Sequence, residues 1–303
     1  PRLEDLPPDP HAEGCTNNAA TLVVSAQLAE AYFELAHAVV EEAPDFGSFM
    51  DAHAPCQDFD ARCTEGFVSS AGQLILRRPP HETQIARYAG LFDVVAAEGG
   101  SFADGARLVP EAMLQAPQFL YRTEVDATEG RVDAHEVANR LSFLVWGSAP
   151  DTALLQAAAQ DRLQTPEQRQ AQVARMLGHP YARAHARQFF IDWFKLDAVR
   201  SLNVSRDRYP MFSDELAEDM RTESLLFFDD LVWERQRPLI ELYTTESSFL
   251  NDRLRGLYDI DGNGAFSETE LANLRERKGL LTQPAILAAH AFGDEPSIVN
   301  RGL

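Results

Sequence analysis

The sequence has few cysteines and lacks the motifs that identify the common enzyme classes. Its 303 residues include three cysteines and five methionines. Three cysteines are too few for a disulfide scaffold, and their spacing does not match a zinc site. There is no Gly-x-Ser-x-Gly, no phosphate loop, no dinucleotide fingerprint and no His-Glu-x-x-His. The chain therefore carries no recognisable motif for hydrolysis, phosphoryl transfer or hydride transfer.

Basic residues and long apolar runs are also scarce. Lys and Arg number 27 against 47 Asp and Glu, which gives a formal net charge of −20 and a pI near 4.7. A nucleic-acid backbone or an anionic lipid surface would repel such a chain. No apolar run reaches the ~18 residues of a membrane span. Hydrophobic residues make up 45% of the chain, which is enough for a sizeable core. We expect a globular protein without nucleic-acid partners or a membrane span.

Apolar residues recur at helical spacing almost throughout the chain, and alternating strand patterns are absent. This predicts an all-α, multi-helix bundle-like body that carries one EF-hand-like calcium loop. The predicted helices cover residues 17–40, 65–76, 81–97, 102–114, 181–194, 213–233 and 283–292, and others start at Asp133 and Thr165. We expect an N-terminal extension with a long helix (1–54), two helical domains (55–128 and 129–248) and a loop-bearing C-terminal part (249–303), packed as one body.

Local signals support two of the helix starts. Asp133 is followed three residues later by Glu136, which is the pattern of a capping box. Thr165 precedes a proline at the first helical position. The helix after Asp133 should bury the apolar residues Val137, Leu141, Leu144 and Val145.

Residues 259–270 have the ligand order of an EF-hand calcium loop. Calcium takes six to eight oxygen ligands, and Gly264 at position six permits the sharp turn. Flanking helices are predicted over residues 249–258 and 268–278. The alternative is an acidic, glycine-bearing surface turn. The candidate ligands are the side chains of Asp259, Asp261 and Asn263, the carbonyl of Ala265, a water held by Ser267, and a bidentate Glu270.

A lone loop of this kind favours a structural role over a sensor role, because sensor loops come in pairs that open a methionine-rich groove. The ligand set indicates modest affinity, roughly 10⁻⁶ to 10⁻³ M. Such a site would stay filled outside a cell.

Cys56 and Cys63 enclose six residues at a turn into a helix, a geometry that permits a local disulfide. We predict that they are bridged and that Cys15 is bonded to neither. An exported location would keep the bond oxidised. Two free buried thiols are the alternative.

Aromatic and ionisable residues on the helices favour structural roles. The series Phe189, Phe190, Trp193 and Phe194 is predicted to be core. His179, His185 and His290 are predicted to be hydrogen-bonded structural histidines. The acidic pairs Asp229-Asp230 and Glu218-Asp219 could hold a second cation, but a solvated helix face is the simpler interpretation.

Several segments, in order along residues 56–303, resemble a family of exported bacterial proteins of unknown function with tandem uncharacterised domains. They are residues 74–82 (LILRRPPHE), 87–92 (RYAGLF), 102–105 (FADG), 113–122 (MLQAPQFLYR), 136–151 (EVANRLSFLVWGSAPD), 223–234 (with FFDDLV at 227–232) and 277–283 (RKGLLTQ).

The resemblance implies a link to planctomycete-type c-type cytochromes, whose haem is attached at Cys-x-x-Cys-His. This chain has no such motif, so any haem c is expected on a C-terminal segment or a partner subunit outside these residues. His290 is the candidate axial ligand and Arg301 the candidate partner of a haem propionate.

The function expected from these features is an exported (periplasmic, cell-surface or secreted), calcium-stabilised body of a haem-linked redox or electron-transfer assembly. The alternatives are a calcium-rigidified extracellular interaction module and a hydrolase of extracellular polymers whose acidic residues converge only in the fold. Whether the chain is an enzyme, and its catalytic residues, are left open.

Overall fold

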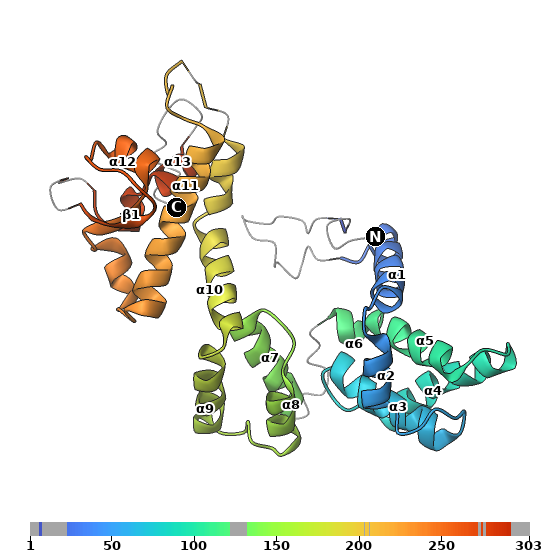
Figure 1. The fold of residues 1–303 in the computed structure, drawn as a ribbon. Coiled ribbons are helices and arrows are strands. Elements are labelled where there is room, and N and C mark those ends of the chain that lie inside the picture. Colours follow the sequence, from blue (N-terminus) through green and yellow to red (C-terminus); the bar gives the residue numbers. More distant parts are fainter. Residues whose placement is uncertain are drawn as a thin grey trace. The chain divides into compact units, whose positions relative to one another are not determined.

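The computed structural model describes residues 6–7, 23–121, 132–202, 204–205, 207–271, 274 and 277–291. Cys15 and Arg301 lie outside these ranges. The described part is mostly helical, as expected, but it also contains one two-stranded sheet (Figure 1). None of its helices is both long and apolar enough to cross a membrane.

The chain divides into two compact units. The first comprises residues 1–144 and 148–172, and the second comprises residues 145–147 and 173–303. The helices of the first unit are α1 (Ala26–Glu41), α2 (Phe46–His53), α3 (Ala61–Ile75), α4 (Glu82–Ala97), α5 (Phe102–Leu114), α6 (Pro117–Leu120), most of α7 (Ala134–Trp146), α8 (Thr152–Ala159) and the start of α9 (Pro166–Leu177).

Aromatic rings from α3, α4 and α5 form the centre of the first unit. Phe67 and Phe92 are fully buried and meet edge to face, with ring centroids 6.0 Å apart. Phe102 packs at 4.8 Å from Phe92. A side chain at Gly105 would collide with the Phe92 ring, so glycine is needed where α5 approaches α4. This arrangement explains why three separate amphipathic helices pack around one cluster.

The local helix-start signals are confirmed. The backbone N–H of Glu136 donates to Asp133 Oδ1 (2.9 Å), and the N–H of Asp133 donates to Glu136 Oε2 (3.2 Å). Thr165 Oγ1 accepts from the N–H of Gln168 (3.3 Å), and Pro166 is the first residue of α9. These bonds satisfy backbone groups that a helix leaves free at its first turn.

The predicted buried face of α7 is wrong at Leu144, whereas Val137, Leu141 and Val145 are half-buried. Leu144 is 75% exposed, whereas Ala134, Ala138 and Ser142 are buried. Apolar residues occupy more than one stripe of this helix, so their spacing does not decide which stripe is buried. The stripe with the small residues Ala134, Ala138 and Ser142 is the one that faces the core.

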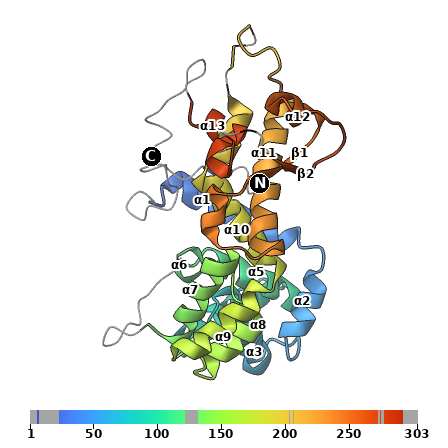
Figure 2. The same ribbon diagram turned by 90° about the vertical axis from the view of Figure 1, so that its left-hand side faces the viewer.

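The second unit is built around α11 (Asp214–Asp229), which contacts helices and a strand from distant parts of the chain (Figures 1 and 2). The N–H of Leu216 donates to Ser213 Oγ, which caps its start. The other elements are α10 (Pro180–Trp193), η3 (Leu196–Ser201), the π-helical η4 (Asp230–Glu234), η5 (Leu239–Tyr243), β1 (Ser247–Leu250), α12 (Asp252–Tyr258), β2 (Ser267–Glu270), η6 (Leu280–Thr282) and α13 (Pro284–Ala289).

The helices predicted on both sides of the calcium loop need correction. Residues 249 and 250 belong to β1, and α12 starts only at Asp252, after Asn251 accepts from the N–H of Leu254 (3.1 Å). Residues 267–270 form β2, antiparallel to β1, with Ser248 opposite Thr269. The leaving helix over 268–278 is therefore absent from its described residues. Strand pairing with a segment about twenty residues away outweighed the local helical spacing.

Only half of the aromatic series on α10 is core, so that prediction is wrong for the other half. Phe190 and Phe194 are buried, and Phe190 stacks on Phe228 at 4.3 Å. Phe189 and Trp193 are 59% and 60% exposed. The residues of each pair are four positions apart and so lie on one stripe of the helix surface. The two stripes are adjacent, and only the stripe with Phe190 and Phe194 faces the core.

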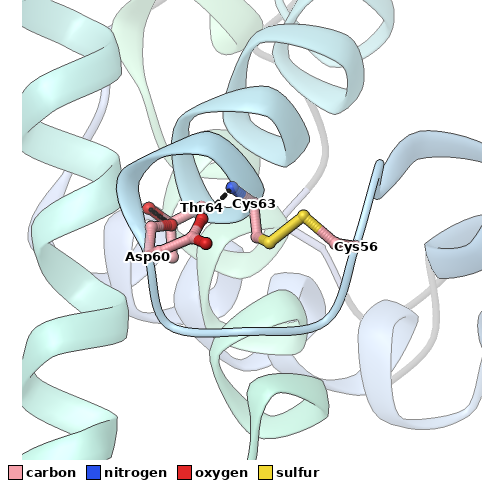
Figure 3. The surroundings of a disulfide bond; sticks show 4 residues. All are labelled: Cys56, Asp60, Cys63 and Thr64. Atoms are coloured by element: carbon pink, nitrogen blue, oxygen red, sulfur yellow. Dashed lines mark hydrogen bonds between the residues drawn. A yellow bond between two sulfur atoms is a disulfide. The ribbon is translucent and has the colours of Figure 1, made fainter.

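The predicted disulfide between Cys56 and Cys63 is confirmed, with Cα atoms 5.0 Å apart (Figure 3). Asp60, within the closed loop, caps α3 by accepting from the N–H of Cys63 (2.9 Å). Cys63 is fully buried in the aromatic cluster. The bond thus ties the segment before α3 to the core of the first unit.

Replacing Cys56 and Cys63 together by serine is expected to lower the free energy of unfolding by about 2 kcal/mol, because a short closed loop no longer restricts the unfolded chain. Denaturant unfolding of both proteins would measure the difference. Mass spectrometry of a non-reduced digest of the unmodified protein should find the linked peptides, and recovery of both thiols free would contradict the pairing.

Candidate functional site

The loop of residues 259–270 begins directly after α12, and its last four residues form β2. Asp259 ends α12 in the left-handed region (φ 56°), and Gly262 and Gly264 have φ of 130° and 124°. Gly264 lies against the start of α12, because its N–H donates to Asp252 Oδ1 and its carbonyl accepts from the N–H of Asp252 (3.2 Å). The glycines therefore stand where the backbone reverses.

The donors of this loop are of the kind that calcium prefers, but they are not drawn together around one point. Asp259, Asp261 and Glu270 are all exposed. Across the described ranges, one group of three Asp, Glu, His or Cys side chains has ligand atoms within 4.8 Å of one another, and it is Cys56, Asp60 and Cys63. Those residues form the disulfide and a helix cap. The oxygen donor set fits calcium, and an ion would have to draw the loop carboxylates inward.

Arg255 places a positive charge beside the loop. Its guanidinium donates to Ser267 Oγ (3.1 Å) and to Thr269 Oγ1 (2.7 Å), which joins α12 to β2. Ser267 was predicted to hold the ligating water, and here its hydroxyl accepts from the arginine. A neighbouring guanidinium repels a cation, so it would weaken the binding of any cation at this loop.

A buried carboxylate lies beneath the stems of the loop. Glu223 on α11 is fully buried, and its Oε1 accepts from the hydroxyls of Tyr258 and Ser248, both at 2.6 Å. Tyr258 immediately precedes Asp259, and Ser248 is the register partner of Thr269. One oxygen atom therefore accepts from the residue that precedes the loop and from the strand that pairs with the end of the loop.

The hydrogen bonds continue from Glu223 into α13. Gln283 Nε2 donates to Ser248 Oγ (3.2 Å), and Gln283 Oε1 accepts from the hydroxyl of Ser224 (2.6 Å). Arg277 lies over the Tyr258 ring, 5.2 Å from its centroid. The described residues provide no hydrogen-bond partner for Glu223 Oε2. This polar network joins α11, α13, β1 and α12 inside an otherwise apolar core.

Burial raises the pKa of Glu223 to about 7, because the charged form loses its hydration. The hydrogen bonds from Ser248 and Tyr258 and the charge of Arg277 act in the opposite direction but do not offset burial. The sequence contained a signal for this residue, since Glu223 falls on the apolar spacing of Leu216, Met220 and Phe227.

Two of the acidic residues predicted to be solvated are buried instead. Asp219 is 7% exposed and bonded to Arg253, and Asp229 is 5% exposed and paired with Arg187 (3.2 Å). Their arginine partners come from other elements. The solvated-face prediction is wrong for these two aspartates, which are buried beneath arginine side chains that remain partly exposed.

The same pairing extends to Asp230 and Glu218, the partly buried members of these acidic pairs. Asp230 is bonded to Arg235 (2.6 Å) and Glu218 to Arg200 (2.7 Å). These contacts are ion pairs with arginine rather than a ligand set for a second cation.

Of the two residues proposed near haem, one can be described. His290 follows α13, and its Nδ1 is 3.0 Å from the carbonyl oxygen of Ile286. If Nδ1 carries the proton, Nε2 has the lone pair that a metal needs. Arg301 lies outside the described residues.

Glu223→Gln is expected to remove a pH dependence of stability. The folded-state pKa, about 7, is above the unfolded value, so the contribution of Glu223 is fully present below about pH 4.5 and is lost as the pH rises through 7. The loss amounts to about 3 kcal/mol. Denaturant unfolding between pH 4.5 and 8.5 should show the variant gaining stability relative to the unmodified protein as the pH rises.

Glu218→Gln is the matched control, because it makes the same change at a partly exposed position of α11, where the carboxylate pairs with Arg200 instead of lying in the core. It should keep the pH dependence of the unmodified protein. Parallel stability curves for Glu223→Gln and the unmodified protein would contradict the assignment.

Comparison with known families gives three matches in order along the chain. Residues 1–44 match a protein of unknown function (DUF1587), residues 63–124 a second (DUF1595) and residues 132–260 a third (DUF1592). No curated protein and no solved structure matches the chain. The third match spans the whole of α11 and ends at residue 260, within the calcium-like loop. The chain therefore carries three domains of unknown function in tandem.

Proposed function

We propose that this chain is an exported helical protein in which a calcium ion, bound by residues 259–270, stabilises the second unit. The observation that carries the proposal is the oxygen-rich loop itself. It is closed by two glycines with positive φ and leaves its carboxylates exposed to solvent. A cation between them would relieve the repulsion among Asp259, Asp261 and Glu270.

The proposed role of the ion is structural. The loop is short, its stems are an α-helix and a strand, and the strand pairs with β1 rather than with a second calcium loop. Binding would hold α12 and β2 at a fixed separation. Modest affinity would suffice outside a cell, and the Cys56–Cys63 bond supports an oxidising, extracytoplasmic location.

A second proposal concerns the assembly in which this body works. The family resemblance supports a haem-linked redox or electron-transfer partner, with haem c on a segment or subunit outside this chain. His290, with Nδ1 directed at a carbonyl, supports a ligand role for Nε2. Arg301 would suit a propionate through a bidentate contact. Haem would supply the electron-transfer chemistry, and this chain would supply the fixed position.

The two alternatives have different support. The exposed Phe189 and Trp193 pair, with ring centroids 5.5 Å apart, would suit a calcium-rigidified interaction module. A hydrolase would need paired carboxylates in contact with substrate. Asp219 and Asp229 are instead buried against arginines, so the interaction module is the better alternative.

Calcium is expected to raise the melting temperature of the protein, and a chelator is expected to reverse the increase. A ligand that binds only the folded state adds about 2.7 kcal/mol at a hundredfold excess over its Kd. Asp259→Ala and Glu270→Gln should each abolish the calcium-dependent shift in a thermal scan. Glu268→Gln changes a non-ligand position of the same loop and should retain the shift. Identical melting curves of the unmodified protein with calcium and with chelator would rule out the role.

The full-length native protein, isolated with its partners, is expected to show a haem Soret band. His290→Ala should change the position or intensity of that band if Nε2 is a ligand, since replacement of an axial ligand alters the electronic state of the iron. A native preparation without haem absorption would contradict the redox assembly and favour the interaction module.

A further inference from the structure

One buried atom accepts hydrogen bonds from the residue that precedes the loop 259–270 and from β1, the strand that pairs with the end of the loop. The first stem ends at Tyr258, directly before Asp259, and the second passes through Thr269, directly before Glu270. Thr269 lies opposite Ser248 in the antiparallel pairing of β2 with β1. The hydroxyls of Tyr258 and Ser248 both donate to Oε1 of Glu223 at 2.6 Å. The outermost proposed ligands, Asp259 and Glu270, therefore each follow a residue whose position depends on this carboxylate.

The attachment point is rigid because it belongs to the core. Glu223, Ser248, Tyr258 and Gln283 are between 0% and 5% exposed. Glu223 is in the middle of α11, whose neighbours in the core include the fully buried Leu225, Leu250 and Leu254. The exposed proposed ligands of the loop are thus adjacent to residues that are packed in the core.

Packed residues behind the loop affect calcium affinity because the proposed ligands are exposed and do not converge on one point. Binding an ion requires the donors to converge, and the cost of ordering them is subtracted from the affinity. Supports behind the ligands reduce that cost by limiting the positions that the stems can adopt. The contacts of Tyr258 and Ser248 with Glu223 restrict both stems at once.

We propose that Glu223 is the positioning residue of the calcium loop, fixing the spacing of its two stems through Tyr258 and Ser248 and thereby setting the affinity for calcium. The inference rests on the proposed calcium function. Glu223 does not itself touch the ion, and it acts through the two hydroxyls.

The test is a calcium titration of the full chain by calorimetry at a temperature where every variant is folded. Tyr258→Phe and Ser248→Ala each remove one hydroxyl and no ligand. Each is expected to weaken calcium binding roughly three- to tenfold, the scale of one lost buried hydrogen bond. Glu223→Ala should weaken it at least as much. Glu223→Gln keeps an acceptor oxygen for both hydroxyls and should bind within about threefold of the unmodified protein, because the geometric support is retained.

A matched control separates positioning from general destabilisation. Phe190→Leu removes part of the ring that stacks on Phe228, in the core of the same unit but on α10 and away from the loop. It should lower the melting temperature without changing the calcium Kd. The effects of Tyr258→Phe and Glu223→Ala on binding should be less than additive, since both break the same contact.

The outcomes distinguish the two levels of the proposal. Absence of calcium binding by the unmodified protein would overturn the calcium function and this inference with it. Calcium binding that is equally tight in Tyr258→Phe, Ser248→Ala and the unmodified protein would overturn the positioning role alone. An equal loss of affinity in Phe190→Leu would also overturn it, because the effect would then come from reduced stability of the unit.

Discussion

The second unit depends on a carboxylate that has no exposure to water. Glu223 is placed by α11 where an apolar side chain would be expected, and its cost of burial is offset only if its neighbours supply hydrogen bonds. Ser248, Tyr258 and, through Ser248, Gln283 supply them. These residues belong to a strand, a helix and the turn into α13. A requirement for polar partners therefore specifies which elements meet on α11, while the surrounding apolar contacts supply most of the stabilisation.

The parts of the fold that could be predicted from sequence are those whose chemistry is local. The capping residues Asp133, Glu136 and Thr165 form bonds within three positions, so both partners of each bond are close together in the sequence. The strands could not be predicted in the same way. Ser267 to Glu270 have no strong preference of their own, and they become a strand because β1 lies beside them.

Which face of a helix is buried could not be predicted from its own residues either. On α10, the pairs 189/193 and 190/194 are equally aromatic, and only the core decides that Phe190 and Phe194 are buried. The loop 259–270 was visible because its oxygen-bearing residues are consecutive. The hydrogen bonds of Glu223 beneath the loop could not be predicted, because Glu223 is 25 positions from Ser248 and 35 from Tyr258 in the sequence. A glutamate at an apolar helical position was the one available sign.

The β1–β2 pair has a consequence for association between molecules. A two-stranded sheet leaves outer backbone groups able to pair with another chain, and exposed edges of this kind promote aggregation. Each strand here is four residues long, and β2 carries Glu268 and Glu270 on a protein of net charge −20. Short length and repeated negative charge oppose the addition of a further strand. The acidity that makes the loop attractive to a cation therefore also protects this edge from self-association.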